Sequence, residues 1–524
     1  GVMMYKNNLY ATSGGRIKRS FGEKTPWMYY PCDNVYYIKL DIDTESGLYS
    51  LWVDGALRFE NAGLSKHCGR SVSSLLFASD GECFINRLSA AKGFDFCSGD
   101  KAKYKLFNAR DFGAAGNGRT LDTESIQKAA DAAAKVKNGA VYLDRGTFLS
   151  GTVKLRSGVT LWVERGATLK GTQNHKHYPL VTPGNSLCAS RQLGRGLVYA
   201  ENADGIRITG GGMLDGNGLY RFKMNDPLND READARPDII YVTYSKNVRI
   251  DNINLRSSAF WSLVPLSCEN VTVEHVNLDC MNTPNRDGID PVDCKNIKVR
   301  HCCIMAGDDG LCFKSSDVFG CENAECDDVM IQSLASGIKF GTDTYYSLKH
   351  AVFRNCVVKN VNRCGVSLET VDGAEVSDVL FENIYMSDVG APVYVTVGAR
   401  NRLPRNKPPV RTSFMDGVTF RRIRFEHPYP FSFEQEIREC MVIGQSETQK
   451  IKNITFEKCD FSLPGGVSKM PDRPHPINDK YPEYDRHGLS SGHAFTFMFT
   501  ENAKVVDCKV TLDREDVRPM SVEF

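Results

Sequence analysis

Three nine-residue segments, "NVRIDNINL" (247–255), "NVTVEHVNL" (270–278) and "NIKVRHCCI" (296–304), share one alternation of apolar and polar positions. Such alternation is typical of a short, half-buried β-strand, and an asparagine begins each copy. Related segments recur along the chain from residue 205 onward. Their first apolar residues, mostly 22 to 39 positions apart, are Ile206, Val248, Val271, Ile297, Val329, Ala351, Val379, Val418 and Ile454.

A recurrence of this length, with one strand in each repeat and no helical periodicity, predicts a solenoid. Stacked coils would hold parallel strands about 4.8 Å apart and bury an apolar interior. The predicted fold class is therefore all-β, a right-handed parallel β-helix. The hand follows from the general rule for parallel crossover connections.

Two parts of the chain depart from the repeat. In "LDTESIQKAADAAAKV" (121–136), Asp122 or Thr123 is expected to cap a helix near 122–136 that closes one end of the solenoid. Residues 1–102 alternate as strands instead, and "TESG" (44–47) predicts a hairpin turn. We expect a small β-sandwich-like domain over 1–102 and a β-helix catalytic domain over 103–524. The apolar stripe of the helix comprises Ile126, Ala129, Ala130 and Ala133.

The charge balance excludes several classes of partner. The 524 residues include 65 basic and 64 acidic side chains, so bulk charge attracts neither nucleic acid nor an anionic membrane.

No run of eighteen apolar residues predicts a membrane span. The opening "GVMMYKNNLY" lacks the plan of a signal peptide, so an export signal has been removed or there was none. A secreted or periplasmic location and a cytoplasmic one both remain open.

The 18 cysteines are interpreted as small apolar core residues, because a chain of this length does not need disulfide staples. No Cys or His cluster has the spacing of a zinc site, and "CENAEC" (321–326) has no second half. We therefore predict neither a metal ion nor a cofactor.

The stretch "NTPNRDGIDPVDCKNIKVRHCCIMAGDDGLCFKS" (282–315) concentrates carboxylates in loop-like settings. Asp287 and the pair Asp308 and Asp309 are separated by close to one coil, so they should fall on adjacent turns of the same face. Neighbouring carboxylates resist simultaneous ionisation, which leaves an acid beside a base, as glycoside hydrolysis requires. The alternative is that both segments are merely turns, in which Asp and Gly are common.

The region from Lys105 to about Phe461 resembles the polygalacturonase family, glycoside hydrolase family 28. The resemblance is carried by "FNARDFGAAGNGRTLDTESIQKAADAA" (107–133), "GGGMLDGNG" (210–218), "RPDIIYVTYSKNVRIDNINLRSSAFWSLVPLSCENVTV" (236–273) and "NRDGIDPVDCKNI" (285–297), in family order. It implies an inverting hydrolase of pectic polysaccharides or oligosaccharides.

The resemblance also implies roles for individual residues. Asp308 matches the general acid, and Asp287 and Asp309 match the residues that hold and activate water. Asn285 and Arg286 stand in the family's Asn-Thr-Asp motif, with Arg in the middle position. Two further positions are interpreted as substrate-binding. They are Lys314, which follows the Asp pair, and Trp261, which matches an aromatic residue beside the cleft.

Two positions depart from the family pattern. The family's Gly-His-Gly motif is replaced by "LASGIKFGTD" (334–343), and its Arg-Ile-Lys motif by Ser367, Leu368 and Glu369. Lys339 either restores a positive charge in the carboxylate column or is a solvated strand residue. Glu369 either accepts hydrogen bonds from sugar hydroxyls or pairs with a neighbouring cation. The predicted substrate is therefore a pectic glycan other than plain polygalacturonate.

Two other functions remain open at this level. A polysaccharide lyase shares the architecture but needs a Lys or Arg base and usually Ca²⁺. A carbohydrate-binding solenoid without turnover is the second, because the His and basic motifs are missing.

Overall fold

The chain divides into two compact units, Gly1–Lys101 and Ala102–Phe524. A computed structural model describes the backbone of five strands in the first unit and most of the second unit. Its described ranges from residue 101 onward are 101–179, 194–218, 236–281, 285–404, 407–426, 439–477 and 481–524.

The described strands of the first unit pair antiparallel. Strands β3 and β4 pair antiparallel, with Ile38 opposite Val53 and Asp43 opposite Leu48, as a hairpin requires. The predicted turn itself, "TESG" (44–47), lies outside the described residues. Whether this unit is a β-sandwich stays a prediction. The five strands are β1 (Val2–Tyr5), β2 (Asn8–Ala11), β3 (Ile38–Asp43), β4 (Leu48–Val53) and β5 (Ala56–Gly63).

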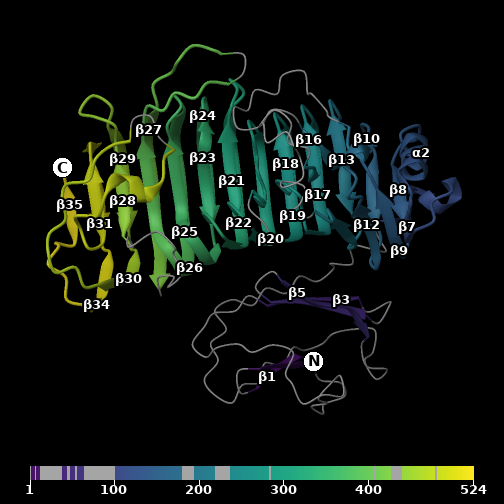
Figure 1. The fold of residues 1–524 in the computed structure, drawn as a ribbon, viewed down its shortest axis with the longest axis horizontal. Helices are drawn as coiled ribbons and strands as arrows, with labels where there is room; N and C mark the ends of the chain where they lie inside the picture. Colours follow the sequence, from purple (N-terminus) through teal and green to yellow (C-terminus); the bar gives the residue numbers. More distant parts are fainter. Residues whose placement is uncertain are drawn as a thin grey trace. The chain divides into compact units, whose positions relative to one another are not determined.

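The second unit is a parallel β-helix, as the repeat predicts. Its strands stand side by side in successive coils, and every pairing between its named strands is parallel (Figure 1). The face that carries the candidate site comprises β10 (Val153–Leu155), β13 (Gly196–Glu201), β16 (Asp238–Thr243), β18 (Leu263–Leu266), β21 (Leu311–Ser315), β23 (Ile338–Thr344), the ends of β25 (Val357–Thr370) and β26 (Glu375–Val397), β28 (Cys440–Ile443), β31 (Phe495–Met498) and β35 (Ser521–Glu523).

The remaining strands complete the coils. Toward the N-terminal end they are β6 (Lys105–Asn108), β7 (Asn117–Leu121), β8 (Gly139–Leu143), β9 (Gly146–Ser150), β11 (Thr160–Val163), β12 (Ala167–Gly171), β14 (Arg207–Thr209) and β15 (Met213–Asp215). The later ones are β17 (Lys246–Arg256), β19 (Glu269–Cys280), β20 (Lys295–Ala306), β22 (Cys321–Ser333), β24 (Ser347–Arg354), β27 (Phe414–Glu426), β29 (Ile451–Glu457), β30 (Asp460–Gly465), β32 (Thr500–Glu501), β33 (Lys504–Val506) and β34 (Lys509–Arg514).

An aromatic stack runs through the core. Phe353, Phe381, Phe420 and Phe456 occupy one register position in four successive coils and are all buried. Their ring centroids lie 4.8, 5.0 and 4.8 Å apart, with interplanar angles of 8, 9 and 14°. Because this spacing matches that of neighbouring strands, each ring buries its faces against the next without disturbing the backbone.

An asparagine at the same turn position in four successive coils has two structural functions. Asn247, Asn270, Asn296 and Asn323 all adopt a left-handed backbone, with φ between 52° and 57°, which asparagine tolerates better than most residues. The side-chain amides of Asn270, Asn296 and Asn323 each donate to the asparagine oxygen of the preceding coil, at 3.0–3.1 Å. The repeat pattern thus encodes a turn and a hydrogen-bonded ladder together.

Helix α2 (Thr123–Ala133) packs against β6, β8 and β10 and buries its predicted apolar stripe. Asp122 is the N-cap residue, as predicted, but its side chain makes no capping hydrogen bond to the helix. Asp122 instead accepts hydrogen bonds from the amides of Ala115 (2.7 Å) and Gly116 (3.0 Å), and Thr123 Oγ1 accepts from Gly151 N (2.7 Å). Both side chains therefore fasten the helix to the first coils rather than to its own amides. Three 3₁₀ turns are η1 (Ala109–Phe112), η2 (His175–His177) and η4 (Tyr484–His487).

Thirteen of the eighteen cysteines fall in the described part of the chain. They form no disulfide, and all except Cys508 are buried, in agreement with their interpretation as core residues. Among the helices of the described ranges, none combines the length and apolar character needed to cross a membrane.

Candidate active site

The predicted carboxylates meet on one face of the β-helix. Gly288 N donates to Asp309 O at 2.9 Å, so the chain after Asp287 lies directly beside Asp309 in the next coil. Gly310 N donates in turn to Ser336 O at 2.9 Å. The separation of about one coil therefore has the geometric consequence expected from the sequence. Asp287 and Asp309 are buried, whereas Asp308 is partly exposed.

Lys314 lies between the carboxylates of Asp287 and Asp290. Its Nζ is 2.7 Å from Asp290 Oδ1 and 3.2 Å from Asp287 Oδ2, and it donates to Cys312 Sγ at 2.8 Å. The same ammonium lies 4.5 Å from the centroid of the Trp261 ring, within cation–π range. Two residues predicted from the resemblance thus contact each other beside Asp287.

Lys339 lies in the next coil, opposite Cys312 in the strand register. Its Nζ is 3.2 Å from Asp309 Oδ2 and 3.3 Å from Glu369 Oε1, and only 1% of its side chain is exposed. Lys339 is therefore a positive charge within the carboxylate column and not a solvated strand residue. Glu369 pairs with this cation and accepts a hydrogen bond from Ser367 Oγ at 2.6 Å.

The environment shifts the pKa values of Asp308 and Asp309 in opposite directions. Burial, together with the negative charges of Asp287 and Asp309, raises the pKa of Asp308 to about 7. Burial would also raise the pKa of Asp309, but the positive charges of Lys339 and Lys314 outweigh it and hold that pKa below its usual value. Below about pH 7 the site thus presents a protonated carboxylic acid next to an ionised carboxylate.

Hydrogen bonds support this division. Asp308 Oδ2 accepts from the backbone N of Asn285 at 3.0 Å and from its Nδ2 at 3.3 Å, which orients the carboxyl group from the preceding coil. Asp309 Oδ1 accepts from Ser336 N at 3.0 Å, a bond that favours the ionised form. Ser336 belongs to the segment where the family's histidine motif was sought.

Asp287 is the most strongly buried of the three predicted carboxylates. Burial and the neighbouring charge of Asp290 raise its pKa well above the usual range, and the pKa of Asp290 is raised to about 6 by burial. Lys314 opposes both shifts. Asp287 and Asp290 therefore act as one unit around a shared ammonium, and Asp309 is the carboxylate held most firmly in its charged form.

Arg286 is placed differently from its neighbours. It is 1% exposed, and its Nη2 donates to Gly218 O at 2.7 Å, whereas Nε and Nη1 are buried and have no hydrogen-bond partner among the described residues. Burial lowers the pKa of Arg286. Its role in binding substrate stays a prediction, because no contact with the three carboxylates is present.

Three residues of the site were missed from the sequence. Asp290 lies three residues after Asp287, in a pattern that the sequence presents as a turn. Arg363 and Glu483 form an ion pair of 2.7 Å, and the charge of each acts on Asp309. Glu483 is separated by 120 residues from Arg363 and immediately precedes η4, so no local pattern could connect it with the site.

The comparison with known families agrees with this geometry. A family model described as "Glycosyl hydrolases family 28" matches residues 138–427, more than half of the chain. The chain belongs to this family. The matched region contains Asp287, Asp308 and Asp309.

Individual relatives are more distant. A "Probable polygalacturonase" of Vitis vinifera is 31% identical over 261 residues, which cover 48% of this chain and 52% of that protein. The chain thus spans about half the length of this relative.

Two solved structures share the fold. An exopolygalacturonase from Thermotoga maritima is 22% identical, with a TM-score of 0.55 over 68% of this chain and 87% of that one. A family 28 exopolygalacturonase from Yersinia enterocolitica is 17% identical, with a TM-score of 0.59 over 80% and 78%.

Replacement of Lys339 tests the buried charge column. We expect Lys339→Met to lower the free energy of unfolding by about 3–5 kcal/mol, because it leaves Glu369 and Asp309 without their cation. Lys349→Met, which breaks a 2.6 Å pair with Glu375 at the surface, should cost only about 0–1 kcal/mol. Denaturant unfolding of both variants and of Lys339→Met/Glu369→Gln provides the measurement. Equal losses for the two single variants would contradict the assignment, as would strict additivity in the double variant.

Proposed function

We propose that this protein is an inverting glycoside hydrolase that cleaves glycosidic bonds in a pectic-type polysaccharide or oligosaccharide. Asp308 is the general acid that protonates the leaving oxygen, and Asp309 is the base that activates water, with Asp287 helping to hold that water. The observation that carries the proposal is the opposite shift of two neighbouring pKa values, which leaves an acid and a base side by side.

The accessibility of the two groups supports these roles. Asp308 is the partly exposed member of the pair, so a sugar in the cleft can receive its proton. Asn285 holds Asp308 Oδ2, which leaves Oδ1 to carry the proton in the acid form. Asp309 is fixed by Ser336 and Lys339, so its charge does not depend on a mobile side chain.

The site lysines argue against a lyase. A lyase base must lose its proton near neutral pH. Burial would lower the pKa of Lys314, but Asp290 and Asp287 outweigh it and hold that pKa well above the usual value. Lys339 is held in the same way by Asp309 and Glu369. Both ammonium groups therefore stay protonated and serve the carboxylates as counter-ions.

The substrate proposal rests on the coil that contains Ser367 and Glu369. Where the family resemblance leads us to expect a cationic clamp for galacturonate, this chain has a hydroxyl and a carboxyl group. Both are buried, and Ser367 Oγ donates to Glu369, which in turn pairs with Lys339. Lys339 is thus already engaged, and a galacturonate carboxylate would find no bidentate partner at these positions.

Arg363 is the residue that tests this reasoning most directly. It is 41% exposed on its side chain, and it reaches the site from the segment that precedes Ser367. Its pairing with Glu483 neutralises part of its charge. We therefore propose that the sugar at the cleavage point is neutral or differently decorated, and that Arg363 serves chiefly to position Glu483.

Reaction products provide the test of the proposed function. Incubation with a panel of pectic oligosaccharides should release reducing ends, and the first product should have the anomeric configuration opposite to that of the bond cleaved. Proton NMR during the first turnovers measures the configuration, and absorbance of an unsaturated uronic ring reports a lyase. Retention of configuration, appearance of the chromophore, or absence of any product across the panel would each refute the proposal.

Substitution of the Asp pair tests the assignment of roles. We expect Asp308→Asn and Asp309→Asn each to lower kcat/KM by about a hundredfold or more, on the order of a lost general acid or base. In the wild type, kcat/KM should fall as pH rises above about 7, because Asp308 then loses its proton. Asp308→Asn should abolish that fall in its residual activity.

The exposed Asp378→Asn is a matched control, because it removes a carboxylate with 78% exposure outside the column. It should leave the pH profile of kcat/KM unchanged. Circular dichroism of each variant separates a loss of chemistry from a loss of folding. Near-normal turnover in Asp308→Asn, or persistence of its alkaline limb, would show that another group is the acid.

Substrate preference is expected to reflect the absence of a cationic clamp at Ser367 and Glu369. We expect kcat/KM for plain oligogalacturonate to be about tenfold or more below that for rhamnose-containing pectic oligomers, because charge-assisted hydrogen bonds contribute about 1.5–3 kcal/mol each. Steady-state kinetics on size-matched oligomers measure the ratio. Arg363→Gln should leave it unchanged. Efficient cleavage of the unbranched acidic oligomer, lost selectively in Arg363→Gln, would show that Arg363 replaces the clamp.

A further inference from the structure

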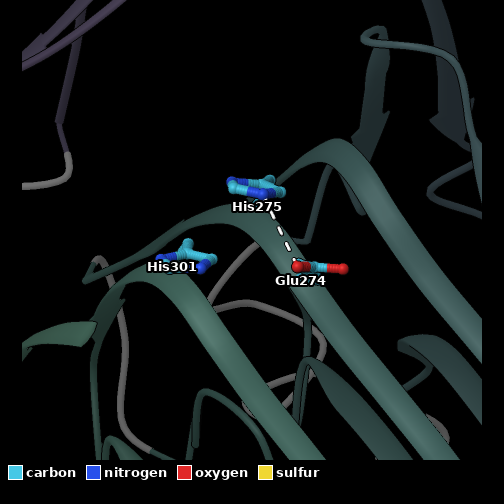
Figure 2. A group of neighbouring side chains, drawn as sticks. All are labelled: Glu274, His275 and His301. Atoms are coloured by element: carbon cyan, nitrogen blue, oxygen red, sulfur yellow. Dashed lines mark ion pairs between the residues drawn. The ribbon is translucent and has the colours of Figure 1, made fainter. Parts of the chain in front are cut away.

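Two histidines occupy equivalent turn positions in neighbouring coils, outside the site described above. His275 in β19 and His301 in β20 adopt φ values of 53° and 52°. Their rings stack with centroids 4.9 Å apart and an interplanar angle of 12°. Figure 2 shows the two rings one above the other, with the carboxylate of Glu274 beside them.

The three side chains offer donor atoms within reach of one another. One donor from each of Glu274, His275 and His301 lies within 4.8 Å of the others, and His275 Nε2 is 3.7 Å from Glu274 Oε1. Zinc bonds of about 2.0–2.1 Å at tetrahedral angles place donors about 3.3 Å apart. Rotation of these partly exposed side chains by about 1.5 Å at their tips would bring all three donor atoms to bonding distance from one ion.

Surrounding residues orient two of these donors. His301 Nδ1 lies 2.9 Å from Asp328 Oδ2 of the next coil, which directs the proton to Nδ1 and leaves Nε2 as the basic nitrogen. Glu274 Oε2 is held by Arg249 at 3.1 Å, so Oε1 is the oxygen that faces His275. A carboxylate that orients a ligating imidazole is a recurrent feature of protein metal sites.

The turn itself does not require histidine. The equivalent position is asparagine in three other coils, Asn252, Asn355 and Asn383, each with φ between 46° and 55°. The left-handed backbone therefore explains a small polar residue but not two successive imidazoles next to a glutamate.

We propose that Glu274, His275 and His301 bind one divalent transition-metal ion, for which Zn²⁺ is the best chemical match. Two imidazoles and one carboxylate suit zinc, whereas Ca²⁺ and Mg²⁺ prefer oxygen donors alone. The ion would join β19 to β20 across the turn and stabilise the stacking of two coils. A solvent-facing fourth position would remain for water.

The other group of possible ligands in the described residues is less suitable. Asp287, Asp290 and Cys312 also lie close together, but the ammonium of Lys314 contacts all three. That cation already supplies the positive charge that a metal ion would bring. Substitution of the histidines, and not of the aspartates, should therefore abolish metal binding to the chain.

Calorimetric titration of the untagged full chain with ZnCl₂ tests the proposal. We expect one equivalent to bind and the thermal midpoint to rise with Zn²⁺ but not with Mg²⁺. His275→Asn and His301→Asn should each weaken Zn²⁺ binding by at least about tenfold, and Asp328→Asn by about tenfold. Because asparagine is native at this turn position, the first two variants should keep the fold.

His350→Asn is the matched control, because His350 has the same turn geometry (φ 54°) and an Asp378 partner at 2.8 Å but no second imidazole beside it in this structure. It should leave Zn²⁺ affinity unchanged. Electron paramagnetic resonance with Cu²⁺ should show two nitrogen ligands in the wild type and one in His301→Asn. Absence of stoichiometric binding, unchanged affinity in both histidine variants, or an equal loss in His350→Asn would overturn the proposal.

Discussion

Parallel stacking brings each side chain to within about 5 Å of its counterparts in the coils before and after it. In a hydrophobic position the result is a continuous core, as in the stack of Phe353, Phe381, Phe420 and Phe456. In a polar position the same spacing requires each hydrogen-bonding group to find a partner in a neighbouring coil. The asparagine ladder satisfies this condition at the turn, because an amide can donate to one neighbour and accept from the other.

The candidate active site is the place where this constraint acts on charges. A carboxylate cannot pair with another carboxylate one coil away, so the column needs cations between its acids. Lys314 and Lys339 supply them in successive coils, each with an ammonium between two carboxylates. Their positions decide which acid keeps its proton: Asp309 contacts Lys339 directly, whereas Asp308 has burial and two negative neighbours to raise its pKa.

The same reasoning connects the active site with the proposed substrate. Lys339 and Glu369 face each other across one coil, so the acidic residue at the position of the expected clamp is balanced by a basic residue one coil earlier. Neither charge is readily tolerated alone in a buried column. The pair preserves the cation that Asp309 needs. In the proposed function, this pairing also removes Lys339 as a partner for a galacturonate carboxylate.

The repeat in the sequence determined the parallel β-helix, and the spacing between Asp287 and Asp309 determined that they share a face. Both follow from short-range periodicity, which a solenoid translates directly into spatial neighbours. The hairpin at "TESG" and the apolar stripe of α2 were local patterns of the same kind.

Other features depended on contacts that periodicity does not describe. The choice between a paired and a solvated Lys339 required the burial of its coil, and the pairing of Arg363 with Glu483 joins segments 120 residues apart. Asp122 was predicted to cap a helix, but it binds two loop amides, because tertiary contacts compete with local capping for the same carboxylate. The sequence by itself determined the fold and the column of acids, whereas only the tertiary structure decided their charges, since pKa values depend on burial and on partners remote in the chain.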